Sequence, residues 1–138
     1  MAIKLNLVSG RAISKGAATG NLLISDKPIS FYGGVDPNTG IVVEKGHPLE
    51  GKSIAGTILA FPHGKGSTVG SYVLYRLKKN GHAPAAMINE SAEAIVAVGA
   101  IISDIPMADQ VDFNGLQKLG AKARLEVRAD GSVSINSA

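Results

Sequence analysis

The pattern of apolar and polar positions predicts several short strands separated by turns rich in glycine and proline. Residues 3–8 alternate between apolar and polar side chains, which is typical of a strand with one buried face. Similar short apolar runs occur at residues 19–25, 41–44, 53–61 and 85–88. The run at 53–61 is apolar on both faces toward its end, which favours a central position in a sheet.

Two segments have the character of helices. Ser67–Lys79 is the clearer one, because its apolar residues recur three and four positions apart and Asn80-Gly81 follows as a stop signal. Residues 91–102 are apolar enough for a buried helix or for a helix followed by a strand. Periodicity alone does not decide between these two interpretations.

The end of the chain predicts a β-hairpin. Residues 123–127 and 132–135 have strand character, and Asp130-Gly131 between them is a typical turn dipeptide. Many strands, two short helices and a closing hairpin predict one compact mixed α/β domain over residues 1–138, part sandwich or barrel.

Composition narrows the possible functions by exclusion. The 138 residues are 45% hydrophobic and 18% charged, a balance that favours a buried core over disorder. The net charge is +3, with three Tyr, three Phe and no Trp, and the basic residues are spread along the chain, so we expect no nucleic-acid partner. No cysteine is present, which excludes an iron–sulfur cluster ligated by this chain alone. The longest apolar run is about half a membrane span, and no leader pattern opens the sequence, which favours a cytoplasmic protein without a membrane partner.

The glycine-rich run Gly64–Ser71 is the best candidate for an anion site, because it joins a buried strand to a helix start. Glycines expose backbone N–H groups there, the helix dipole adds positive charge, and Lys65 would add more. The run fits neither the Walker A motif nor the dinucleotide fingerprint, because Gly66 separates Lys65 from Ser67 and the glycines are spaced one residue too far apart. Taken alone, Ser67 is most simply a helix N-cap.

A second glycine-rich stretch, Gly33–Gly40, is either an ordinary connection or a loop that covers a ligand. Asp36 and Asn38 alternate as in a calcium loop, but the other ligand positions of such a loop do not fit. Histidines lie at positions too far apart for a metal site, namely His47, His63 and His82.

Four segments in series closely resemble the small subunit of the aconitase X family. They are Ser30–Gly40 (SFYGGVDPNTG), Gly64–Tyr72 (GKGSTVGSY), Pro84–Asn89 (PAAMIN) and Ala97–Ile102 (AVGAII). The resemblance covers essentially the whole chain and implies the swivelling β/β/α domain that aconitases carry as their mobile domain. It also implies a larger, cysteine-bearing catalytic partner that ligates a 4Fe–4S cluster. In archaea such a complex is a hydro-lyase that converts a phosphorylated hydroxy acid, (R)-5-phosphomevalonate, to trans-anhydromevalonate 5-phosphate on the mevalonate route to isoprenoids.

The resemblance also implies site residues. Ser67 matches the first serine of the G-x-G-S-S-R segment of ordinary aconitases, which is their proton-abstracting base. The residues expected to bind substrate around it are Lys65, Gly66, Thr68, Gly33, Gly34 and Asp36. Thr68-Val69-Gly70 stands where ordinary aconitases have Ser-Arg. The contact to the substrate carboxylate is therefore expected from the partner or from backbone N–H groups around Gly33 and Gly34.

Three alternatives differ from this hypothesis in substrate or in class. The bacterial branch of the family dehydrates cis-3-hydroxyproline, so another hydroxy acid is the first alternative. Related swivelling domains carry a phosphoryl group on histidine, which here would need His63 or His82 as acceptor. The third is an assembly domain without a catalytic role.

Overall fold

The computed structural model describes residues 5–65, 68–119 and 123–136, and eight strands and four helices lie within them. The strands are β1 (Leu5–Val8), β2 (Arg11–Ser14), β3 (Ala18–Ile24), β4 (Ile58–Phe61), β5 (Ala86–Asn89), β6 (Met107–Asp109), β7 (Arg124–Val127) and β8 (Val133–Asn136). The helices are α1 (Phe31–Gly34), α2 (Val69–Lys79), α3 (Ala94–Ile102) and α4 (Phe113–Gln117). Among the helices described, none is long and apolar enough to cross a membrane.

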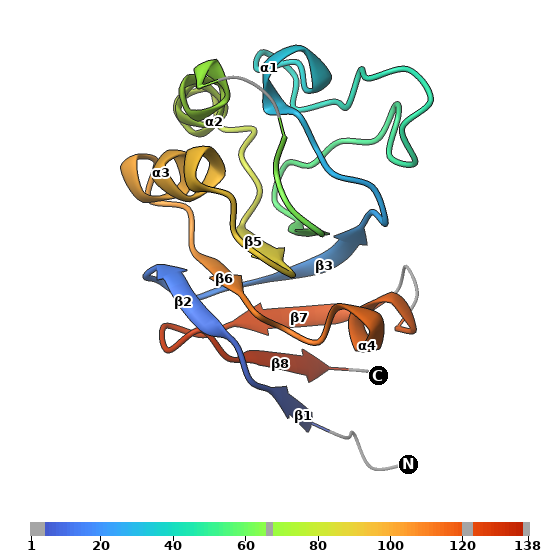
Figure 1. Ribbon diagram of the computed structural model, residues 1–138, viewed down its shortest axis with the longest axis vertical. Helices are drawn as coiled ribbons and strands as arrows, with labels where there is room; N and C mark the ends of the chain where they lie inside the picture. The colour runs from blue at the N-terminus through green and yellow to red at the C-terminus, as the bar shows by residue number, and fades with distance from the viewer. Residues whose placement is uncertain (1–4, 66–67, 120–122, 137–138) are drawn as a thin grey trace.

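The strands form one mixed sheet in the order β1-β8-β7-β3-β4-β5-β6-β2. The four central strands β3, β4, β5 and β6 are parallel, and the strands on both sides of them pair antiparallel. Figure 1 shows α1, α2 and α3 on one side of the parallel strands, with β1, β7, β8 and α4 on the other. The result is a layered arrangement of helices, parallel strands and an antiparallel hairpin, as expected for a β/β/α domain.

The parallel strands separate two hydrophobic cores. Leu59 and Phe61 of β4 face the helices, whereas Ile58 and Ala60 face the hairpin and α4. All four side chains are fully buried, which confirms the central position predicted for this strand. On the helical side the Phe61 ring meets the ring of Phe31 edge-on, with 5.8 Å between centroids, and this contact anchors α1 over the sheet.

Most predicted strands are confirmed within the described residues, but two predictions need correction. The expected strand at 41–44 is wrong, because Ile41 and Val42 form only isolated bridges, to Ser53 and Val35. The expected strand at 53–61 begins only at Ile58, since a turn precedes it. Two of the elements not predicted, β2 and β6, are short and make their pairings between distant parts of the chain.

The predicted helix Ser67–Lys79 is confirmed over Val69–Lys79. It ends as expected, because Gly81 adopts φ +78° and the backbone N–H of Asn80 donates to the carbonyl of Arg76. Ser67 lies outside the described residues, so its role as an N-cap stays a prediction. Thr68 stands at the N-cap position and makes no side-chain capping bond within the described part of the chain.

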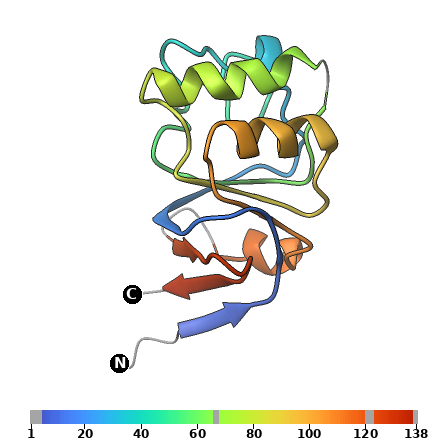
Figure 2. The same cartoon turned by 90° about the vertical axis from the view of Figure 1, so that its left-hand side faces the viewer.

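Residues 94–102 form a helix, which decides the choice that periodicity left open. The Glu93 carboxylate caps α3 by accepting hydrogen bonds from the backbone N–H groups of Ile95 and Val96, at 2.9 and 3.3 Å. The expectation that this segment is buried is only half right. Val96 packs into the core, but Val98, Ile101 and Ile102 lie on the side of the helix away from the sheet and are about half exposed. Figure 2 shows α2 and α3 side by side, without any described element over their outer surface.

A buried carboxylate ties the edge strand β2 to the sheet. Arg11 donates two hydrogen bonds to the Asp109 carboxylate, at 2.9 and 2.8 Å, and the backbone N–H of Ala92 donates a third at 2.9 Å. Burial raises the pKa of Asp109. The hydrogen bonds from Arg11 and Ala92, together with the charge of Arg11, more than offset that effect and hold this pKa below its ordinary value.

We predict that this carboxylate makes stability dependent on pH in the acid range. A carboxyl whose pKa is lower in the folded than in the unfolded chain stabilises the fold fully above its unfolded pKa of about 4, and loses that effect as the pH falls through its folded pKa. In urea denaturation, Asp109→Asn should therefore cost most near about pH 7, with the difference from wild type shrinking below about pH 4. Asp26→Asn, at an exposed turn, is the matched control. A difference that is constant over this pH range would contradict the assignment.

Candidate functional site

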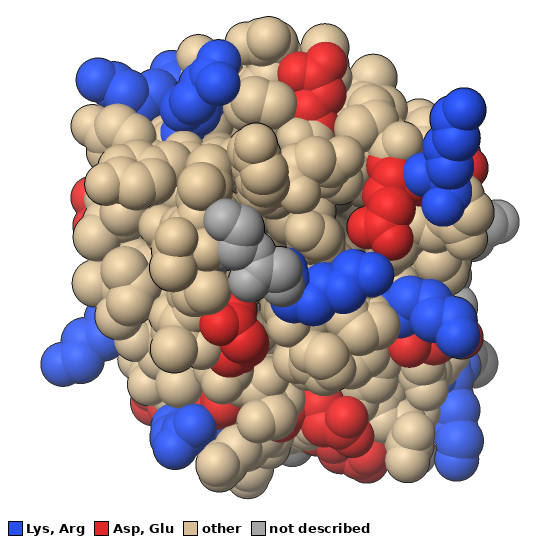
Figure 3. All heavy atoms as spheres, turned by 45° about the horizontal axis from the view of Figure 1, so that its top comes forward, with Lys and Arg blue, Asp and Glu red and all other residues tan. Residues whose placement is uncertain are grey.

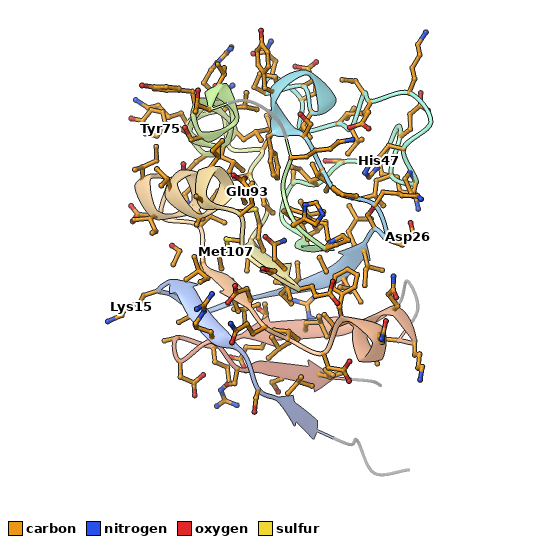
Figure 4. All side chains as sticks on the ribbon, in the orientation of Figure 1. Lys15, Asp26, His47, Tyr75, Glu93 and Met107 are labelled. Carbon is orange, nitrogen blue, oxygen red and sulfur yellow. The ribbon has the colours of Figure 1, made fainter. Side chains whose placement is uncertain are left out.

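The glycine-rich segment after β4 is held from two sides. On one side it pairs with Ile29, two residues before α1, since the backbone N–H of Lys65 donates to the carbonyl of Ile29 at 3.1 Å. On the other side Gly64 packs against α3, where a Cβ on Gly64 would overlap Cγ2 of Val96. Figure 4 shows Glu93, which caps α3, at the start of that helix and next to the segment. These contacts fix the position of the backbone from which the Lys65 side chain extends.

The second glycine-rich stretch lies beside it because α1 is kinked. Gly33 has φ +83°, a conformation that glycine adopts without strain, and no described atom lies within 4 Å of the place a Cβ would take. Gly34 is buried, and its carbonyl accepts hydrogen bonds from the backbone N–H groups of Val43 and Glu44, at 2.8 and 3.3 Å. The backbone of α1 is therefore held in place at Gly34 and remains accessible at Gly33.

These segments line an open surface hollow of about 290 Å³. Its lining residues are Ser30, Tyr32, Gly33, Gly34, Glu44 and Lys65. Inside it, Nζ of Lys65 lies 3.4 Å from Oε2 of Glu44, and both side chains remain partly exposed. The hollow thus combines one cation, a carboxylate that holds it, and the open backbone at Gly33. Figure 3 shows this end of the molecule, with acidic and basic side chains next to one another at the right and basic side chains gathered at the upper left.

A larger hollow of about 390 Å³ shares Tyr32 and Gly33 with the first. Besides these two residues, it is lined by Val35, Asp36, Pro37, Val43, Val73 and Arg76. The Asp36 carboxylate accepts a hydrogen bond from the backbone N–H of Asn38 at 2.9 Å, as in an Asx turn. Asp36 therefore shapes the loop and lies in a different hollow from Lys65.

The residues predicted from the sequence thus divide among three places. Lys65, Gly33 and Gly34 line one hollow, and Asp36 lines the neighbouring one. Thr68 borders a third hollow, of about 210 Å³, between α2 and α3. The predicted residues Gly66 and Ser67 lie outside the described residues. Sequence reasoning missed Glu44, which it assigned only to a strand, so no signal pointed to its place opposite Lys65.

The histidines of the described residues lie apart and have separate environments. His47 is buried, and its ring accepts a hydrogen bond from the N–H of Leu49 and donates one to the carbonyl of Pro28, which makes it part of the core. Nδ1 of His63 lies within hydrogen-bonding distance of the carbonyl oxygen of Gly64, at 2.8 Å. The alternative that a histidine of this chain carries a phosphoryl group stays a prediction. Among the described residues, no three His, Asp or Glu side chains gather to hold a metal ion. With no cysteine in the sequence, this chain does not fit an iron–sulfur cluster of its own.

Fold and glycine-rich site together define an aconitase-type swivel domain. The family model of the aconitase X swivel domain matches residues 7–135, and the chain belongs to this family. Over 112 residues it is 62% identical to the phosphomevalonate dehydratase small subunit of Methanosarcina acetivorans, a match covering 81% of this chain and 78% of that one. It is 58% identical over 128 residues to the corresponding subunit of Methanocella arvoryzae, covering 93% and 96%.

A solved structure agrees with this assignment. The crystal structure of the holo form of aconitase X from Thermococcus kodakaraensis is 55% identical and superposes with a TM-score of 0.89. The match covers 94% of this chain and 98% of that one. These comparisons confirm the swivel fold that the four sequence segments implied.

Proposed function

We propose that this chain is the small subunit of a phosphomevalonate dehydratase, a hydro-lyase that works only together with a larger subunit. The complex removes water from (R)-5-phosphomevalonate and releases trans-anhydromevalonate 5-phosphate. The observation that carries this proposal is the identity of about three residues in five to small subunits of that name, sustained over most of both chains. The hollow beside Lys65 adds a site suited to an anionic substrate.

In this proposal Ser67 is the base. As an alkoxide it takes the proton from the carbon next to the substrate carboxylate, and the electrons of that C–H bond form the new double bond. The hydroxyl would depart with the electron pair of its C–O bond and take up a proton from an acid of the large subunit, so that it leaves as water. An alkoxide is unfavourable in water. Backbone N–H groups at the start of α2 and the ammonium group of Lys65, two positions away, would lower its cost.

The hollow beside Lys65 supports a proposal for how the substrate binds. Lys65 would pair with an anionic group of the substrate, and the N–H groups around Gly33 and Gly34 would bond its oxygens. Gly66 and Thr68, which flank Ser67 in the sequence, are proposed as further substrate contacts. Glu44 opposes this binding, because its carboxylate holds Nζ of Lys65 and repels an incoming anion. We give Asp36 a supporting role, since its carboxylate bonds its own loop.

An iron–sulfur cluster is the cofactor that the family implies. We assign its ligands to cysteines of the large subunit, since this chain has none. The contribution of this chain is then restricted to the base, to anion binding and to closing the site.

The test is to produce this chain together with the large subunit of the same source under anaerobic conditions, and to assay the purified complex. Dehydration of 5-phosphomevalonate would support the proposal. A complex that is inactive on that substrate but dehydrates cis-3-hydroxyproline would keep the hydro-lyase class and overturn the substrate. A complex active with Ser67→Ala would instead favour an assembly domain.

We predict opposite effects at the two charges of the hollow. Lys65→Met should raise KM by about 10-fold, because a charge-assisted hydrogen bond contributes about 1.5 kcal/mol or more. Glu44→Gln should lower KM, because it frees Lys65 and removes a repulsive charge. Lys118 is exposed and directly follows α4, so Lys118→Met is a control for the change in net charge. Steady-state kinetics of the complex measures all three, and an unchanged KM in both hollow variants would exclude the hollow from substrate binding.

A further inference from the structure

We propose that the outer surface of α2 and α3 is the docking surface for the large subunit. This helical face consists of Tyr72 and Tyr75 on α2 and Val98, Ile101 and Ile102 on α3. The inference rests on the proposed function in one respect, namely that the chain works with a larger partner.

Helix α3 has no polar side. Its nine residues, AIVAVGAII, contain no polar side chain, whereas a helix that faces water normally carries polar residues on its outer side. Val98, Ile101 and Ile102 are 52, 53 and 49% exposed. Clustered exposed apolar side chains of this kind mark interaction surfaces.

The two helices α2 and α3 pack closely and present one continuous surface. Gly99 lets them approach closely, because a Cβ there would lie only 3.1 Å from Cα of Ser71. Residues of both helices line the hollow between them, namely Thr68, Ser71, Ala94, Ile95 and Val98. Figure 4 shows Tyr75 on the outer side of α2. Exposed aromatic side chains on α2 next to branched apolar side chains on α3 are typical of the centre of an interface.

Position and charge together identify the partner. Thr68 borders the hollow between the two helices and directly follows Ser67 in the sequence, so a subunit that holds substrate against Ser67 would lie next to this face. Its rim is basic, because Arg76, Lys78 and Lys79 follow in the last turn of α2. These three make no ion pair with a carboxylate of the described residues. We therefore expect the large subunit to present an apolar patch bordered by Asp and Glu.

The cations at the rim make only weak contacts of their own. Arg76 donates to the Asn38 side chain at 3.5 Å, Lys78 donates to the carbonyl of Asp104 at 3.3 Å, and Lys79 lies over the ring of Tyr75. Figure 3 shows basic side chains at the upper left, beside a broad area on the α2 and α3 side with few charged groups. Carboxylates of a partner at this border could therefore form ion pairs with these three side chains.

The experiment measures binding of this chain to its large subunit by anaerobic calorimetry without substrate. The double substitution Val98→Glu with Ile101→Glu should raise Kd by about 100-fold, because it places two charges at the centre of the interface. Ile41→Glu, an exposed apolar residue outside both helices, should change Kd by less than about threefold. Thermal unfolding of each free chain shows that the variants fold.

Two outcomes would overturn the docking surface. One is an unchanged Kd for a folded double variant. The other is a double variant that turns a self-associating chain into a monomer without changing Kd, which would assign the face to a second copy. Failure of the proposed function is separable from both, because a wild-type pair that binds tightly but does not dehydrate 5-phosphomevalonate rejects only the substrate.

Discussion

Replacing Ser67 with alanine should lower kcat of the dehydratase complex by about 1,000-fold or more, while the chain still folds and binds its partner. The expected loss is large because a positioned base contributes about 10²- to 10⁴-fold. The expected cost in stability is small, since losing an N-cap costs about 1 kcal/mol. Single-turnover measurements on the anaerobic complex would separate the chemical step from substrate binding.

Ser71→Ala is the matched control for this experiment. Ser71 is a second serine near the start of α2, and its hydroxyl donates to the carbonyl of Thr68 at 2.9 Å. We expect its variant to keep near-normal kcat. Near-normal kcat in Ser67→Ala would show that Ser67 is not the base, and an equal loss in both variants would attribute the effect to the helix start.

Gly64→Ala should both destabilise the chain and impair the complex. The added methyl group overlaps Cγ2 of Val96, a side chain that is 4% exposed and has no room to move. Overpacking of this kind costs about 1 to 3 kcal/mol. Relief by a shift of the backbone would displace the segment that carries Lys65 and Ser67. We therefore expect kcat/KM to fall by at least about 10-fold, since misplacement by about 1 Å can cost 100-fold.

Adding Val96→Ala to Gly64→Ala tests the steric explanation directly. The smaller side chain makes room for the methyl group, so the double variant should be more active than Gly64→Ala alone. Gly70→Ala is the control, because a Cβ there would meet its neighbours only at ordinary distances of 3.8 Å and more. Independent, additive effects of the Gly64 and Val96 substitutions on stability and activity would contradict the explanation.

The sequence predicted the parts of the molecule that depend on local pattern. The central strand β4, helix α2 and the closing hairpin each carry their own periodicity and stop signals. The exposure of α3 was not predictable in this way, because a helix that is apolar all round gives no indication of which side meets the core.

The candidate site was predictable only in part. The two glycine-rich segments were evident, and the resemblance implied that they act together. The pairing of Lys65 with Glu44 joins residues 21 positions apart and depends on the path of the loop after Gly40. That loop follows isolated bridges and turns, which leave little trace in the order of apolar and polar residues.

The division into two cores has a consequence for engineering this protein. Because side chains alternate along the parallel strands, substitutions on the hairpin side, at Ile88 or Ala108, alter a core that shares no side chain with the helical one. Thermostability can therefore be optimised in one half of the molecule while Lys65 and its surroundings keep their shape.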